Sequence, residues 1–159
     1  MSEQRTREYL ERVFDFDLDG HPLLSNNSKW INFLNVRNAH WSKGNVVLLG
    51  DSLHTAHFSI GSGTKLALED SIALHQCFVQ KGEVSAALSE FEKVRKPVIE
   101  EYQAAAEESC VWFENAREYM HLTPIELAYS LMTRSGRVDD ESLRRRDPLF
   151  MERYDGRRK

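Results

Sequence analysis

One stretch constrains the fold more than any other, NVVLLGDSLHTAHFSIGSGTKLALEDSIALHQ at residues 45–76. Its four apolar residues at 46–49 have no polar face, which is typical of a short strand covered on both sides in a parallel or mixed sheet. The strand ends at Gly50 and Asp51, and a helical pattern covers 64–80 after a loop with two further glycines. The stretch therefore predicts a strand, a glycine-containing loop and a helix, with the helix N-terminus at the loop.

Such a loop is a candidate ligand site. Backbone N–H groups and the positive end of the helix dipole favour an anion or a polarised carbonyl there. Gly61 and Gly63 lack side chains, so a flat or phosphate-bearing ligand could approach the backbone, and Asp51 can accept hydrogen bonds from hydroxyls. Neither G-x-G-x-x-G nor G-x-x-x-x-G-K-S/T occurs, and the spacing alone also fits a tight connection. The loop predicts a ligand with hydroxyls and an electron-rich edge.

The other elements are predicted from helical spacing, turn residues and helix caps. In order they are an amphipathic helix with one buried stripe over 3–14, a loop over 15–27, a strand within 30–41 and a turn over 42–45. Ser85 is the expected cap of a long helix that Pro97 kinks or divides. The TPIE run at 123–126 opens another helix, which ends near Met132. Beyond Arg137 charge dominates, which favours a surface segment or a frayed end.

Length and composition set the fold class. A chain of 159 residues that is 41% hydrophobic can form one ordinary core, so a single unit is expected. Two strands are too few for a self-sufficient sheet. The predicted class is an α/β fragment, a short strand pair followed by several long helices.

Charge and cysteine usage limit the partners. The formal net charge of -4 argues against nucleic acid or an anionic membrane surface as a partner. Cys77 and Cys110 are the only cysteines and are interpreted as single thiols. No apolar run approaches the length of a membrane span, and the N-terminus is charged. We therefore expect a soluble, cytoplasmic protein.

The segment GDSLHTAHFSIGSGTKLALEDSIAL resembles the second FAD-contacting motif of the FAD-dependent aromatic hydroxylases, the p-hydroxybenzoate hydroxylase-like superfamily. WINFLNVRNAHW, FEKVRKPVIEEYQ, WFENAREYMHLTPIELAYSLMTRSGR and ESLRRRD are similar to the branch with salicylyl-CoA 5-hydroxylase and 2-aminobenzoyl-CoA monooxygenase. The positions that match the motif are Gly50, Asp51, His54, Gly61, Gly63, Glu69 and Asp70.

The resemblance implies the C-terminal portion of a longer enzyme with a Rossmann-like FAD/NAD(P)-binding fold, whose N-terminal FAD-binding half is not found here. It divides the chain into the end of a substrate-side region (1–45), the flavin motif and its helix (46–82), C-terminal helices (83–137) and a charged tail (138–159). It implies FAD, NAD(P)H and oxygen, an aromatic or aromatic acyl-CoA substrate, and Asp51 on the flavin ribitol. No residue is assigned as catalytic and no metal is expected; a homodimer is left open. The cofactor-binding residues it implies are Gly50, Asp51, Gly61, Ser62, Gly63, Thr64 and Lys65.

Two positions depart from the family pattern. Phe58 stands where the family usually has proline, and Lys65 stands where it usually has asparagine. Lys65 could supply charge beside the flavin pyrimidine or could point to solvent. His57 and Phe58 are the candidates for contact with the aromatic substrate.

Other interpretations of the same residues are weaker. Asp51, His54 and His57 have a D-x-x-H-x-x-H spacing, but a closed metal site usually needs a fourth ligand. His54 is interpreted as a packed loop histidine that orients the Gly-Asp turn. Ser52 or Ser59 beside a histidine suggests hydrolysis, but no G-x-S-x-G elbow occurs.

The remaining alternatives concern the C-terminal half. Trp112, Phe113 and Tyr119 are interpreted as core residues, with a substrate entrance as the alternative. Arg144 to Arg146 form a solvated face or, with Arg134 and Arg137, contact CoA phosphates. The second function class is a non-catalytic fragment whose helices dock a partner.

Overall fold

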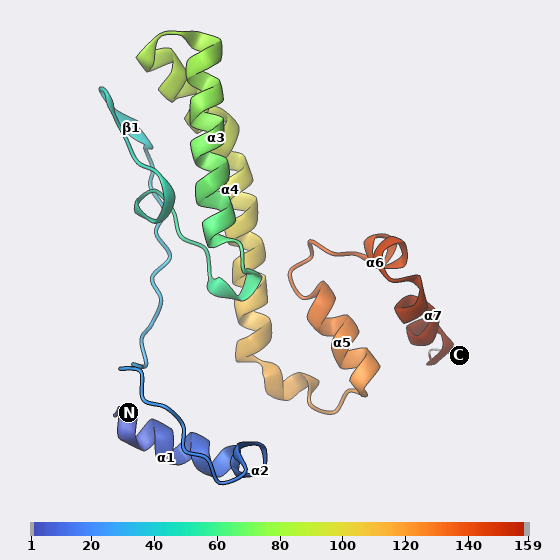
Figure 1. Ribbon diagram of the computed structural model, residues 1–159. Helices are drawn as coiled ribbons and strands as arrows, with labels where there is room; N and C mark the ends of the chain where they lie inside the picture. The colour runs from blue at the N-terminus through green and yellow to red at the C-terminus, as the bar shows by residue number, and fades with distance from the viewer. Residues whose placement is uncertain (1, 158–159) are drawn as a thin grey trace. The chain divides into compact units, whose positions relative to one another are not determined.

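The computed structural model describes residues 2–157 and is mostly helical (Figure 1). The chain divides into two compact units, Met1–Phe33 and Leu34–Lys159. Within the described residues, no helix is both long enough and apolar enough to cross a membrane.

The first unit contains α1 (Glu3–Val13) and the single turn α2 (Asp15–Leu18), which starts inside the predicted loop. The Ser2 hydroxyl caps α1 by accepting the Arg5 amide at 3.3 Å. Glutamates of α1 hold the returning chain, since Glu3 accepts the Ser28 amide at 2.8 Å. The helix is confirmed, but its buried stripe is wrong, because neither α1 nor α2 buries a residue. No second layer among the described residues therefore covers the apolar side chains of α1 and α2.

The second unit begins with a strand pair much shorter than predicted. The strands β1 (Ser42–Lys43) and β2 (Val46–Val47) are antiparallel and joined by a tight turn. The strand predicted within 30–41 is wrong: its described backbone forms only an isolated bridge between Arg37 and His54. Val46 is 62% exposed, so β2 is not covered on both faces, and the parallel or mixed sheet is wrong for the described residues. The rest of the apolar run packs against the core instead.

Two long helices form the body of this unit. In Figure 1, α3 (Gly63–Lys81) and α4 (Val84–Glu114) run side by side in opposite directions. Gly82 ends α3 in the left-handed conformation. The predicted cap at Ser85 is wrong, because Glu83 precedes α4 and accepts the amides of residues 85 and 86. Pro97 does not divide α4, which continues to Glu114.

The main core lies between this helix pair and the loop that precedes it. The Trp41 ring packs at a centroid distance of 5.4 Å from Phe91, which is fully buried. Each fully buried aliphatic side chain contributes roughly 1.5–3 kcal/mol. The buried members of the cluster are Trp41, Leu53, Leu66, Cys77, Ala87, Phe91 and Ile99.

The C-terminal part forms further helices where a surface segment or a frayed end is predicted. After the turn η3 (Ala116–Tyr119), α5 (Pro124–Thr133) begins with the predicted capping box of Thr123 and Glu126. A frayed end is wrong for the described residues, because α6 (Asp140–Arg146) and α7 (Pro148–Arg157) follow; most of their residues are exposed, in agreement with a surface segment. Their apolar residues are widely spaced among arginines, yet they meet in a second small core of Leu143, Met151 and Tyr154.

Candidate functional site

The turn after β2 fixes the predicted ribitol-binding carboxylate. Gly50 has a φ of +59°, in the left-handed region that favours glycine, and starts the short turn η1 (Gly50–Ser52). Its carbonyl accepts the amides of Leu53 and His54 at 2.9 and 3.0 Å. Leu53 is fully buried, whereas the Asp51 side chain is exposed and has no hydrogen-bond partner among residues 2–157. The turn thus holds a carboxylate in solvent on a firmly anchored backbone.

A buried polar network joins this turn to both long helices. His54 Nε2 lies 2.6 Å from Asp70 Oδ2, and Arg95 Nε donates to Asp70 Oδ1 at 2.9 Å. The exposed fractions of His54, Asp70 and Arg95 are 5%, 0% and 9%. A carboxylate only accepts, so both neighbours donate to it and satisfy its two oxygens. His54 therefore occupies the orienting position expected for a packed loop histidine.

A second set of hydrogen bonds holds the loop that follows the turn. The Thr55 amide donates to the Val36 carbonyl at 3.1 Å, and the Val36 amide donates to the Thr55 hydroxyl oxygen at 2.7 Å. The buried Gln103 side chain of α4 donates to both of their carbonyls, at 3.0 and 2.7 Å. Asn38 donates to the carbonyls of Ser52 and Leu53. The loop is therefore attached to the segment before β1 and to α4.

The next turn, η2 (Phe58–Ile60), carries the two candidates for substrate contact. His57 Nδ1 lies 2.9 Å from the Ser59 hydroxyl, and the His57 and Phe58 ring centroids are 4.3 Å apart. Phe58 is 65% exposed. Arg134 donates to the Ser59 carbonyl and to the Ser109 hydroxyl, both at 2.8 Å. The Arg134 guanidinium thus links the loop to α4 and α5.

The N-terminus of α3 lies directly after this turn. Gly61 is left-handed, with a φ of +62°, and the buried Ser62 hydroxyl donates to the Ile60 carbonyl instead of capping the helix. The first residues of α3, Gly63, Thr64 and Lys65, are exposed. A Cβ added to Gly63 would meet no atom within 4 Å, and its φ is not positive. Nothing in the described chain therefore requires glycine at 63, whereas a closely approaching ligand would.

Lys65 forms its contacts along the helix pair. Its ammonium donates to Glu69 and, at 3.1 Å, to the Tyr102 hydroxyl. The hydrogen bond to Glu69 is the largest cause that raises the pKa of Lys65, and the hydrogen bond to Tyr102 is the next largest. The hydrogen bond from Lys65 in turn lowers the pKa of Glu69. The Arg137 guanidinium lies 3.9 Å from the Tyr102 ring centroid. Two cations thus gather at Tyr102, near the start of α3.

The weaker interpretations gain no geometric support. Among residues 2–157, no group of three or more His, Cys, Asp or Glu side chains is placed to hold a metal ion. Asp51, His54 and His57 therefore do not form a metal cluster. Ser59 does meet His57, but no hydrogen bond joins His57 to a carboxylate in the described chain. The third member of a hydrolytic triad is missing there.

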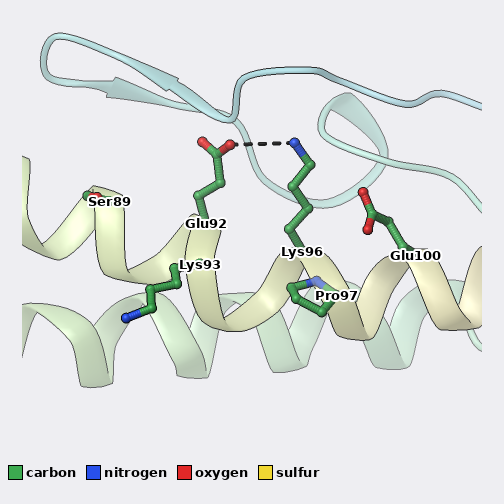
Figure 2. A pocket seen from close by; sticks show the side chains of 6 residues that line it. All are labelled: Ser89, Glu92, Lys93, Lys96, Pro97 and Glu100. Atoms are coloured by element: carbon green, nitrogen blue, oxygen red, sulfur yellow. Dashed lines mark ion pairs between the residues drawn. The ribbon is translucent and has the colours of Figure 1, made fainter.

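A separate hollow lies along α4. Figure 2 shows its side chains, with Glu92 and Lys96 paired across one turn of the helix at 3.6 Å. Glu92 also accepts the Trp41 amide at 3.1 Å, and Lys96 donates to the Ala39 carbonyl at 2.8 Å. These side chains anchor the backbone before β1. The hollow measures about 450 Å³ and is lined by Ser89, Glu92, Lys93, Lys96, Pro97 and Glu100.

Sequence reasoning missed the residues that support the loop from behind. It named Asp70 only as a motif match, and it named neither Arg95 nor Gln103. A signal for Asp70 exists, because Asp70 lies four residues after the buried Leu66 on the same helix face. A charged residue on an apolar face predicts a buried partner. Arg95 and Gln103 carry the same signal, because they lie four residues after the buried Phe91 and Ile99 on one face of α4.

Comparisons with known proteins relate this chain to curated aromatic monooxygenases. A scan against known protein-family models finds no match to this chain. Curated enzymes at 38–42% identity cover 81–98% of the chain. The resemblance to the aromatic hydroxylases is confirmed.

Three relatives give the particular likeness. The chain is 42% identical over 159 residues, 98% of its length, to salicyloyl-CoA 5-hydroxylase of a Streptomyces species. It is 42% identical over 130 residues, 81% of its length, to 3-hydroxy-4-methyl-anthranilyl-[aryl-carrier protein] 5-monooxygenase of Streptosporangium sibiricum. It is 38% identical over 135 residues, 84% of its length, to protodeoxyviolaceinate monooxygenase of Chromobacterium violaceum. The aligned segments span 30%, 36% and 36% of these relatives, about a third of each.

Proposed function

We propose that this chain is part of a flavin-dependent aromatic hydroxylase and that residues 50–65 hold FAD. The observation that carries the proposal is the homology to aromatic monooxygenases over most of the chain. It coincides with an exposed carboxylate and an uncapped helix N-terminus in one loop. The remainder of the Rossmann-like FAD/NAD(P)-binding fold would come from the portion of the relatives outside the aligned segment.

The residues present fit the cofactor. Asp51 has an exposed carboxylate without a partner in residues 2–157, so it can accept a hydrogen bond from a ribitol hydroxyl. The amides around Gly61 to Thr64 lie at the positive end of α3, which favours negative charge at the flavin pyrimidine edge by about 0.3–2 kcal/mol. Bound FAD would supply the reducible ring system that activates oxygen, with NAD(P)H as reductant. The His54, Asp70 and Arg95 network would hold the turn that bears Asp51.

The proposed substrate is an aromatic compound, in particular an aromatic acyl-CoA. Two of the three relatives are named for aromatic acyl groups carried on CoA or on an aryl-carrier protein. Exposed arginines suit phosphate groups. Arg144 is paired with Asp155 at 2.6 Å, so Arg145 and Arg146 are the arginines of that run without an ion pair in residues 2–157. His57 and Phe58 remain the proposed contacts with the ring.

The test uses a full-length enzyme in which this chain replaces the aligned segment of the Streptomyces relative. We expect Asp51→Ala to weaken FAD binding at least about tenfold, because a charge-assisted hydrogen bond to the cofactor is lost. Asp51→Asn should weaken binding less. The matched control is Asp17→Ala, an exposed aspartate of α2. FAD content and affinity are read from bound-flavin absorbance and fluorescence titration.

Equal FAD affinity in the two alanine variants would reject the role of Asp51. A chimera that binds no FAD and hydroxylates no aromatic acyl-CoA, although it folds, would reject the proposed function. The second function class, a non-catalytic segment that docks a partner, would then remain.

A further inference from the structure

Helix α3 is apolar on two opposite faces, and the described residues cover only one of them. Leu66, Asp70 and Cys77 point into the interface with α4 and are buried. On the opposite side, Leu68, Ile72 and Val79 are 62%, 56% and 70% exposed. At 100° per residue these three fall within one narrow stripe that also includes the exposed His75. We call Leu68, Ile72, His75 and Val79 the outer stripe of α3.

The outer stripe lacks the charges of a solvated helix face. The ten residues SIALHQCFVQ at 71–80 contain no Lys, Arg, Asp or Glu, although 29% of the chain is charged. The exposed side of α4 differs, since it carries Lys93, Glu101 and Glu108 among other charges. A helix with apolar residues on two opposite faces is typical of a position between two layers. The outer stripe is therefore built for a second layer.

We propose that the outer stripe of α3 is the docking surface for the cofactor-binding part of a full-length monooxygenase, which is the part of the relatives outside the aligned segment. This inference rests on the proposed function and names its partner surface. About two thirds of each relative lies outside the aligned segment, so a complete enzyme has ample chain to form the second layer. The proposed flavin-edge residues, Gly63 to Lys65, belong to the first turn of the same helix. A partner that binds the rest of FAD must approach α3.

The test measures thiol labelling at one stripe position. Ile72→Cys is made in a background with Cys77→Ala and Cys110→Ser, both in the 159-residue chain and in the Streptomyces chimera. We expect maleimide to label Ile72→Cys at least about tenfold more slowly in the chimera than in the chain alone, because docking removes the face from solvent. The control is Glu101→Cys on the charged side of α4, which should label at similar rates in both proteins.

Equal labelling of Ile72→Cys in the two proteins would overturn the proposal. Protection of Ile72→Cys in a chimera that binds no FAD would support docking while rejecting the flavin function. Protection that persists in the Asp51→Ala chimera would support docking independent of cofactor binding.

A second measurement needs only the 159-residue chain and covers the case in which the chimera does not fold. Sedimentation of the chain over a wide concentration range reports whether it self-associates. A dimer that Ile72→Glu dissociates and Lys93→Glu leaves intact would make a second copy the occupant and overturn the proposal. A monomeric chain in which maleimide labels Ile72→Cys rapidly supports the proposal, because the outer stripe is then exposed and not covered by a second copy.

Discussion

At the scale of single residues, Asp70 has the largest structural role in the loop, because two buried donors depend on it. His54 and Arg95 reach it from positions 16 and 25 residues away, and the exposed fraction of Asp70 is 0%. Breaking a buried ion pair by removing one partner typically costs about 3–5 kcal/mol, since the remaining charge stays buried without compensation. The ion pair of Arg37 and Glu107, at 3.3 Å, is exposed to solvent, and such a pair contributes little to stability.

We therefore expect Asp70→Asn to lower the free energy of unfolding of the 159-residue chain by about 3–5 kcal/mol. Glu107→Gln, whose partner Arg37 is 57% exposed, should leave the free energy of unfolding unchanged within error. Urea denaturation followed by circular dichroism measures both. A loss for Asp70→Asn no larger than that for Glu107→Gln would show that the network does not stabilise the loop.

The same residues show what the sequence could and could not predict about the site. The sequence predicts the turn at Gly50 and Asp51 and the start of α3 close to where the structure has them. Both are local features of the chain, so local patterns are enough to predict them. The partners of His54 are tertiary, and no spacing rule joins positions 54, 70 and 95. Whether residues 50–65 bind flavin stays a prediction.

At the scale of elements, local capping signals predict helix boundaries when the side chain bonds within its own turn. Thr123 and Glu126 do so, and α5 begins where the sequence predicts. Glu83 also caps locally, but serine is the more usual cap, so the sequence predicts Ser85 at a position that Glu83 occupies. The short strands were overestimated because a strand needs a partner: apart from one isolated bridge at Arg37, 30–41 has no strand pairing in the described chain.

The cap at Glu83 gives a prediction with a definite pH sign. Hydrogen bonds from the Ser85 and Ala86 backbones lower the pKa of Glu83 below its ordinary 4.5. A carboxyl group whose pKa is lower in the folded state stabilises above its unfolded pKa, and this stabilisation is lost as pH falls through the folded pKa. Glu83→Gln should therefore lower the thermal midpoint at neutral pH, and the difference from wild type should shrink below pH 4.5.

The matched control for the cap is Glu101→Gln, in the middle of α4, where the carboxylate accepts no hydrogen bond from residues 2–157. Its thermal midpoint should follow the wild-type pH curve throughout. Thermal unfolding between about pH 3 and pH 7 distinguishes the two variants. A Glu83→Gln difference that is constant over this range would mean that the charge of the cap does not matter.

At the scale of the whole molecule, burial is unevenly distributed, and the two units should differ in local stability. Neither α1 nor α2 buries a residue, whereas α4 buries Phe91 and Ile99 to 0% and 2% exposure. Local opening costs little where few apolar contacts are lost and approaches the global free energy in the core. The amphipathic pattern of 3–14 was read correctly as a helix, but the second layer it predicts is not among the described residues.

We therefore expect the amides of α1 to exchange with solvent deuterium near the unfolded rate in the isolated 159-residue chain. Those of α4 around Phe91 and Ile99 should be protected at least a hundredfold, since their opening requires loss of the main core. Hydrogen exchange with mass spectrometry resolves both segments in one experiment. Phe91→Ala supplies the internal control: it should reduce protection throughout α3 and α4, by a core cost of about 3–5 kcal/mol, and leave α1 unchanged. Protection of α1 equal to that of α4 would mean that the first unit has a covering layer, and a self-associated state would then be the first place to look for it.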